Sequence, residues 1–189
     1  MTTKSIYEFK DLMTEMNIDV AKLGCVMLPV EPFDIFGEGR DSLLNREDLY
    51  VSPDPAKFWV KGDVSENAHI TLLYGLIQPA YIISSWVDEV LAGWERPEFL
   101  APERISFFPS PDANELGYAA IVVEVEDEHL VEANQRLSYL PHVNTFPDYR
   151  PHMTLAYVKL SEAQKWMDAL ENAQFHLYVK DGLDYGSKK

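Results

Sequence analysis

The sequence is poor in cysteine and in basic residues, and both shortages exclude classes of protein. Cys25 is the only cysteine in 189 residues, so an intrachain disulfide and a cysteine-based zinc site are both excluded, which suits a reducing cytoplasm. Lys and Arg number 16 against 31 Asp and Glu, giving a formal charge of −15. Because such a surface repels a long polyanion, we do not expect duplex nucleic acid as the partner.

Long apolar runs are also missing. Nowhere do about 18 uncharged apolar residues follow one another, and residues 1–20 lack the continuous apolar stretch of a signal peptide. We therefore expect neither a membrane span nor a secretion signal. Since no Gly/Ser-rich linker or low-complexity tract interrupts the chain, we expect a single domain over residues 1–189.

Apolar periodicity predicts a mixture of helices and strands, and hence the α+β class. An amphipathic helix is predicted over residues 4–17, within the N-terminal 20 residues. Further helices are predicted after Pro79, after Asp127 as the cap, and over about residues 161–172, with Ser161 as the cap and Gln164 three residues on. Strands are predicted over residues 24–30, 58–61, 69–77, 105–108, 118–125, 152–158 and 175–179.

One short pattern occurs twice, 83 residues apart (152 − 69). The stretches HITLLYG, from residue 69, and HMTLAYV, from residue 152, share His, Thr, Leu and Tyr at their first, third, fourth and sixth positions. A pair of His-x-Thr motifs arises by chance in about 1% of chains of this composition, counted by matches. The repeat therefore indicates a shared function.

Alternation of side chains along a strand predicts where the motif residues point. His69 and Thr71 should share one face of their strand, and His152 and Thr154 should share one face of theirs. The same alternation places Leu73 beside the first pair and puts the other motif residues on the reverse, apolar face: Ile70, Leu72, Tyr74, Met153, Leu155 and Tyr157. Two such strands brought together would present two imidazoles and two hydroxyls to one site.

Two imidazoles and two hydroxyls suit phosphodiester cleavage without a cofactor. A neutral His can remove a proton from an attacking hydroxyl, and a protonated His can donate one to the departing oxygen. Thr hydroxyls can donate hydrogen bonds to the non-bridging phosphate oxygens. Since no carboxylate or third His stands at ligand spacing beside His69 and His152, we expect no metal.

The paired motifs resemble those of the 2H phosphoesterase superfamily, over roughly residues 24–179. The resemblance implies a bilobal fold, with two pseudo-symmetric lobes of antiparallel strands, helices outside and a central cleft. The stretches HITLLYGL, RLSYLPHVNTFPDYRPHMTLAYV and GLDYG are similar in texture to phage-encoded members that include the anti-CBASS cyclic-oligonucleotide phosphodiesterases. That likeness implies metal-independent cleavage of a cyclic di- or trinucleotide defence signal, in the host cytoplasm if a phage encodes the chain.

Two other functions stay open. RNA-end processing, as in proteins similar to RNA 2′,3′-cyclic phosphodiesterases and 2′-5′ ligases, would need a local basic strip. A non-catalytic module could instead bind a cyclic nucleotide without cleaving it. Candidate substrate contacts, each with a surface or core role as the alternative, are Lys61, Arg150 and Lys159 for phosphate and Tyr7 and Trp59 for base stacking. The oligomeric state, and which His is the acid, stay open.

Overall fold

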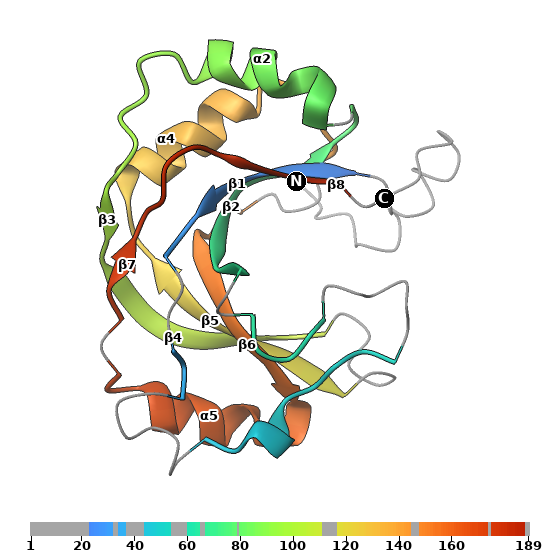
Figure 1. Ribbon diagram of the computed structural model, residues 1–189, viewed down its shortest axis with the longest axis vertical. Coiled ribbons are helices and arrows are strands. Elements are labelled where there is room, and N and C mark those ends of the chain that lie inside the picture. The colour runs from blue at the N-terminus through green and yellow to red at the C-terminus, as the bar shows by residue number, and fades with distance from the viewer. Residues whose placement is uncertain are drawn as a thin grey trace, which may run out of the picture.

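The computed structural model (Figure 1) describes residues 23–31, 34–36, 44–53, 60–64, 67–78, 80–110, 117–144, 148–173 and 175–187. The predicted N-terminal helix, Tyr7, Phe58 and Trp59 lie outside these residues. The helices are α2 (Ala80–Val90), α4 (Glu128–Leu137) and α5 (Ala163–Leu170), with 3₁₀ turns η3 (Arg46–Asp48) and η6 (Leu160–Glu162). The strands are β1 (Gly24–Pro29), β2 (His69–Leu76), β3 (Phe99–Leu100), β4 (Pro102–Pro109), β5 (Tyr118–Val125), β6 (His152–Lys159), β7 (Leu177–Tyr178) and β8 (Asp184–Ser187).

Six of these strands form one antiparallel sheet in the order β4-β5-β6-β2-β1-β8, and β3 pairs separately with β7. The two strands that begin at the motif histidines, β2 and β6, are neighbours at the centre. The sheet therefore divides into two three-stranded halves, β8-β1-β2 and β4-β5-β6, each with one motif at its inner edge. The predicted α+β class and the predicted pair of antiparallel lobes are confirmed.

Helices cover one face of the sheet, here called the core face. α2 packs on β1 and β8, α4 on β2 and α2, and α5 on β4 and β5. In Figure 1, α2 and α4 lie at one end of the molecule and α5 at the other, with the sheet between them. Fully buried side chains from all three helices and the sheet form one core, in which each large aliphatic residue stabilises the fold by about 1.5–3 kcal/mol.

The start of α4 is confirmed and that of the last helix is not. Asp127 caps α4, since its carboxylate accepts hydrogen bonds from the backbone N–H groups of His129 at 2.9 Å and Leu130 at 3.1 Å. The predicted cap at Ser161 is wrong. Ser161 lies inside η6, where its hydroxyl donates to the Glu162 carboxylate at 3.1 Å, and Glu162 precedes α5 without a side-chain cap. Gln164 bonds to Asp168 instead of closing a capping box.

The motif strands β2 and β6 share one registered backbone pair, and other segments of the chain pair with them beyond it. β2 and β6 share the registered pair Ile70 and Met153. Past this pair, residues 49 and 63, which precede β2 in the chain, bridge to Val158 and Ala156 of β6. Residue 142, which precedes β6, bridges to Leu76 of β2. Each motif strand therefore has its free edge covered by the segment that leads into the other.

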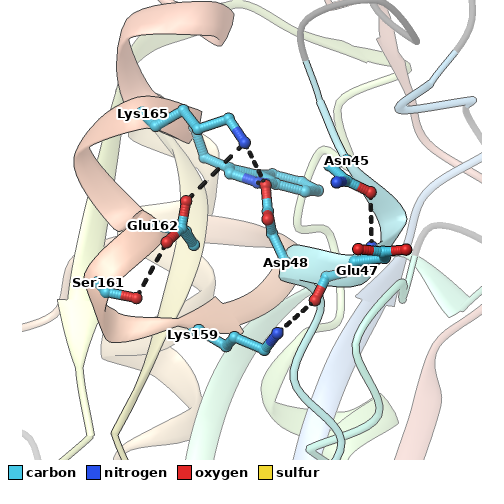
Figure 2. Close-up of polar contacts among 8 residues, drawn as sticks. Asn45, Glu47, Asp48, Lys159, Ser161, Glu162 and Lys165 are labelled. Carbon is cyan, nitrogen blue, oxygen red and sulfur yellow. Dashed lines mark hydrogen bonds and ion pairs between the residues drawn. The ribbon is translucent and has the colours of Figure 1, made fainter.

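A polar anchor fixes the segment that lies along β6 (Figure 2). The buried Asp48 carboxylate accepts hydrogen bonds from Lys165 Nζ at 2.7 Å and Trp166 Nε1 at 3.0 Å. Lys159 Nζ donates to the Glu47 carbonyl at 2.6 Å. These contacts attach η3 to α5 and to the end of β6, where the Tyr50 N–H then donates to the Tyr157 carbonyl at 2.8 Å.

Candidate active site

The motif side chains lie together on the face of the sheet opposite the core face, here called the motif face. Ile70 and Met153 are paired and fully buried on the core face, so the residues on either side of each project from the motif face. Because the strands are antiparallel, this register brings His69 level with Thr154 and Thr71 level with His152. All four of these side chains are half-buried.

Both motif imidazoles are held by the same local contact. His69 Nδ1 lies 2.8 Å from the Asn67 carbonyl oxygen, and His152 Nδ1 lies 2.7 Å from that of Arg150. A carbonyl oxygen can only accept, so Nδ1 donates and the neutral ring keeps its lone pair on Nε2. His142 makes the same contact with Leu140 at 2.9 Å, so the pairing of the motif strands is what distinguishes the site.

Electrostatics links the two imidazoles. Burial lowers the pKa of His152 below its ordinary value, while the hydrogen bond to the Arg150 carbonyl and the nearby Glu124 carboxylate act in the opposite direction. The charge of His69 also lowers the pKa of His152. The two rings are therefore within electrostatic range of each other, although their motifs are 83 residues apart (152 − 69).

A β-bulge in β2 overturns part of the predicted alternation. Thr71 pairs with Met27 and Tyr74 with Cys25, so three steps along β2 match two along β1 and both side chains fall on one face. Leu72 and Leu73 are both buried. The prediction that Leu73 joins the His69 face and that Tyr74 leaves it is wrong. The bulge leaves the Leu72 carbonyl outside the ladder, and Asn134 Nδ2 of α4 donates to it at 2.6 Å.

The same bulge recurs in β6. Thr154 pairs with Val122 and Tyr157 with Ala120, which places Tyr157 on the motif face and corrects the prediction that it lies behind the motif. The two residues between them, Leu155 and Ala156, are buried. Burial raises the pKa of Tyr157 to about 12, so its hydroxyl stays a hydrogen-bond donor at neutral pH.

Glu124 on β5 is a further residue of the site that was not predicted from the sequence. It is registered opposite His152, is buried, and bonds to Arg104 at 2.7 Å and to the Ser106 hydroxyl. The hydrogen bond from the Arg104 guanidinium holds the pKa of Glu124 below its usual range. A lone carboxylate within the apolar strand YAAIVVEV is the only local signal that could have identified it.

The candidate substrate contacts have different positions. Arg150 is exposed two residues before β6, and its charge lowers the pKa of Glu124, which places it near the His152 side of the site. Lys159 is engaged by the Glu47 carbonyl. Lys61 is exposed in a bridge to Val51.

Aromatic rings line the motif face of the second half. The Phe108 ring meets the His152 ring edge-on, with centroids 4.9 Å apart. Tyr118 packs against Tyr157 at 5.8 Å and is stacked with Tyr50 at 5.2 Å. Phe108 therefore supplies an apolar ring edge to His152, and the tyrosine rings lie toward the other end of β6.

Within the part of the chain that the structure describes, no group of three or more His, Cys, Asp or Glu side chains is arranged to hold a metal ion. None of the helices described there has the length and apolar character needed to cross a membrane.

Comparisons with known proteins show the fold. No protein-family model matches the sequence, and no curated protein matches it. Among solved structures, Usb1 of Kluyveromyces marxianus is similar with a TM-score of 0.52 at 9% identity, over 89% of this chain and 95% of that one. Usb1 of the same organism with uridine monophosphate gives a TM-score of 0.44 at 11% identity, over 88% and 99%. The first likeness shows that the chain has the 2H phosphoesterase fold.

Proposed function

We propose that this protein is a metal-independent phosphodiesterase that uses His69 and His152 as the acid and base on one phosphodiester. The observation that carries the proposal is the register of Ile70 with Met153, which sets both His-x-Thr motifs side by side on the motif face. The 2H phosphoesterase fold supports the same function.

The local chemistry supports proton transfer by both rings. With each Nδ1 committed to a backbone carbonyl, Nε2 is the atom that faces a substrate. One neutral imidazole removes the proton from a water or a ribose hydroxyl, and the other, protonated, donates to the departing oxygen. Thr71 and Thr154 donate hydrogen bonds to the non-bridging oxygens as negative charge shifts onto them.

An RNA end is the first candidate substrate. The chain as a whole carries a charge of −15 and so disfavours long polyanions. On the His152 side, however, Arg150 is exposed, and Arg104, although it is paired with Glu124, keeps a largely exposed side chain. These two arginines supply the local positive charge that the RNA-end function requires of so acidic a protein, and a cyclic di- or trinucleotide is the alternative substrate.

The test is a substrate panel in EDTA, analysed by mass spectrometry. The panel holds short RNAs with 2′,3′-cyclic phosphate or 3′-hydroxyl ends, cyclic dinucleotides and cyclic trinucleotides, at physiological salt. We expect cleavage of an RNA end by the wild type. If only the cyclic oligonucleotides give products, the substrate is a cyclic oligonucleotide and not an RNA end. If the protein binds a nucleotide but forms no product, it is a nucleotide-binding module and not an enzyme. Activity lost in EDTA and restored by a divalent metal would contradict metal independence.

A further inference from the structure

The two halves of the site carry the same motif but different neighbours. On the middle strand of the second half, Glu124 stands opposite His152. On the middle strand of the first half, Pro29 stands opposite His69. A carboxylate therefore faces one motif imidazole, while a ring without charge or N–H occupies the corresponding position beside the other.

Glu124 is fixed in place and held ionised. Arg104 Nη2 lies 2.7 Å from one of its oxygens, the Ser106 hydroxyl donates to the other, and all three residues lie on the same face of β4 and β5. Glu124 as a whole residue is 7% exposed, so water screens its charge only weakly. A nearby carboxylate favours the protonated form of an imidazole, because the imidazolium and the carboxylate attract each other.

The other charged groups around His152 either disfavour its protonated form or act on Glu124. His69 on β2 disfavours a second positive charge at His152. Arg104 on β4 and Arg150, two residues before His152, both act on Glu124. Phe108, also on β4, supplies an apolar ring edge. Glu124 is thus an anionic group that, together with the hydrogen bond to the Arg150 carbonyl, offsets part of the cost of protonating a half-buried ring.

We propose that Glu124 is a positioning residue that sets the proton affinity of His152 but not that of His69, so that the two motif histidines are chemically different. A ring with a carboxylate neighbour gains and loses its proton at a different pH from a ring without one. The inference rests on the proposed function only in its activity readout, since the titration of His152 can be measured on the protein without substrate.

The first test is an NMR titration of the imidazole resonances of the full chain. Glu124→Gln removes the negative charge and keeps the shape, so we expect the His152 pKa to fall. Arg104→Gln leaves the carboxylate without its cation, so we expect the His152 pKa to rise. His69 should move less than His152 in both variants. Glu126→Gln is the matched control, because it removes the same charge at an exposed position two residues further on and should shift neither ring.

Opposite shifts at His152 in the two variants support the inference. Equal shifts at both histidines, or an unchanged His152 in Glu124→Gln, overturn it. If Glu124→Gln does not fold, Arg104→Gln carries the test alone, and an upward shift confined to His152 is the required result.

The second test is the pH dependence of kcat/KM on the best substrate of the panel. Glu124→Gln should change kcat at neutral pH by much less than the about 10²- to 10⁴-fold loss typical when a general acid or base is removed, with little change in KM. One limb of the profile should move while the other stays, and the limb that moves identifies the role of His152. Movement of both limbs contradicts the inference. A wild type that cleaves nothing removes the proposed function and leaves the titration result standing.

Discussion

Ile70 and Met153 face each other where β2 meets β6, and neither side chain is accessible to solvent. This buried pair joins the two halves of the sheet. The motif residues project from the opposite face on either side of it, so their mutual positions depend on how these two side chains pack. A loss of packing beneath the motifs should therefore affect both stability and activity.

Met153→Ala tests that dependence. We expect the free energy of unfolding to fall by about 2–5 kcal/mol, because the change leaves a cavity under the motif strands. Urea denaturation measures it, and activity under conditions where the variant is folded should fall as well. Met167→Ala on α5, where Met167 is only partly buried against the core, is the control and should cost less. Equal losses of stability and activity in the two variants would contradict the role given to the Ile70–Met153 pair.

Removal of either motif imidazole should abolish most of the activity. We expect His69→Ala and His152→Ala each to lower kcat by about 10²- to 10⁴-fold, with thermal unfolding close to that of the wild type. His142→Ala is the matched control, since His142 makes the same contact with a carbonyl two residues before it but lies on neither motif strand. Wild-type turnover by either motif variant would remove the assignment.

Gly75 allows the segment before β6 to approach β2. Its φ is +100°, and a Cβ there would collide with the carbonyl oxygen of Val143. The backbone N–H of Val143 donates to the Gly75 carbonyl at 2.8 Å, which holds the two segments close together. Gly75→Ala should therefore destabilise the protein by about 3 kcal/mol or more, through backbone strain and the collision together. Gly93→Ala shares the positive φ but meets nothing within 4 Å, so about 1–2 kcal/mol is expected. Chemical denaturation of both variants measures the difference.

The Asp48 anchor should make stability depend on acid pH. Burial raises the pKa of Asp48, but hydrogen bonds from Lys165 and Trp166 outweigh it and lower the pKa below the ordinary value. A carboxyl group with a lowered folded-state pKa contributes stability above its unfolded pKa of about 3.9, and that contribution is lost as the pH falls through the folded-state value. Asp48→Asn should cost about 1–3 kcal/mol at pH 7 and flatten the stability profile below about pH 4.

The control for that prediction is Asp168→Asn. Asp168 is exposed on α5 and accepts a hydrogen bond only from the neighbouring turn, from Gln164 at 2.7 Å. Its replacement should leave both the stability at pH 7 and the acid slope nearly unchanged. An identical acid slope in wild type and Asp48→Asn, measured by urea denaturation between pH 3 and 7, would show that the anchor does not supply it.

Local sequence patterns predicted the elements that carry the motifs, because β2 and β6 are rich in β-branched and aromatic residues. The same patterns gave wrong predictions where a β-bulge interrupts the alternation of side chains between the two faces of a strand. Alternation assigned Tyr74 and Tyr157 to the core, but one extra residue in each strand returns both to the motif face. A bulge depends on the partner strand and on groups such as Asn134 that satisfy the freed carbonyl, and neither can be read from the strand itself.

Long-range pairing also hid two features. Glu124 acquires its role only when β5 pairs with β6 and β4 supplies Arg104, which are facts of register. β8 was missed because the stretch DYGS is short and contains a glycine, and it becomes a strand by pairing with β1 across most of the chain. Composition and periodicity describe a segment alone, whereas these residues are defined by what lies beside them.

The exchange of edge segments around β2 and β6 also bears on the architecture as a whole. One half without the other would leave its motif strand with an open row of backbone donors and acceptors, an edge prone to pair with another chain. In the intact protein, the segment that leads into the motif strand of the second half pairs with this edge and satisfies its backbone groups. In this one respect the two halves resemble the protomers of a domain-swapped dimer, in which each copy lends a segment to the other.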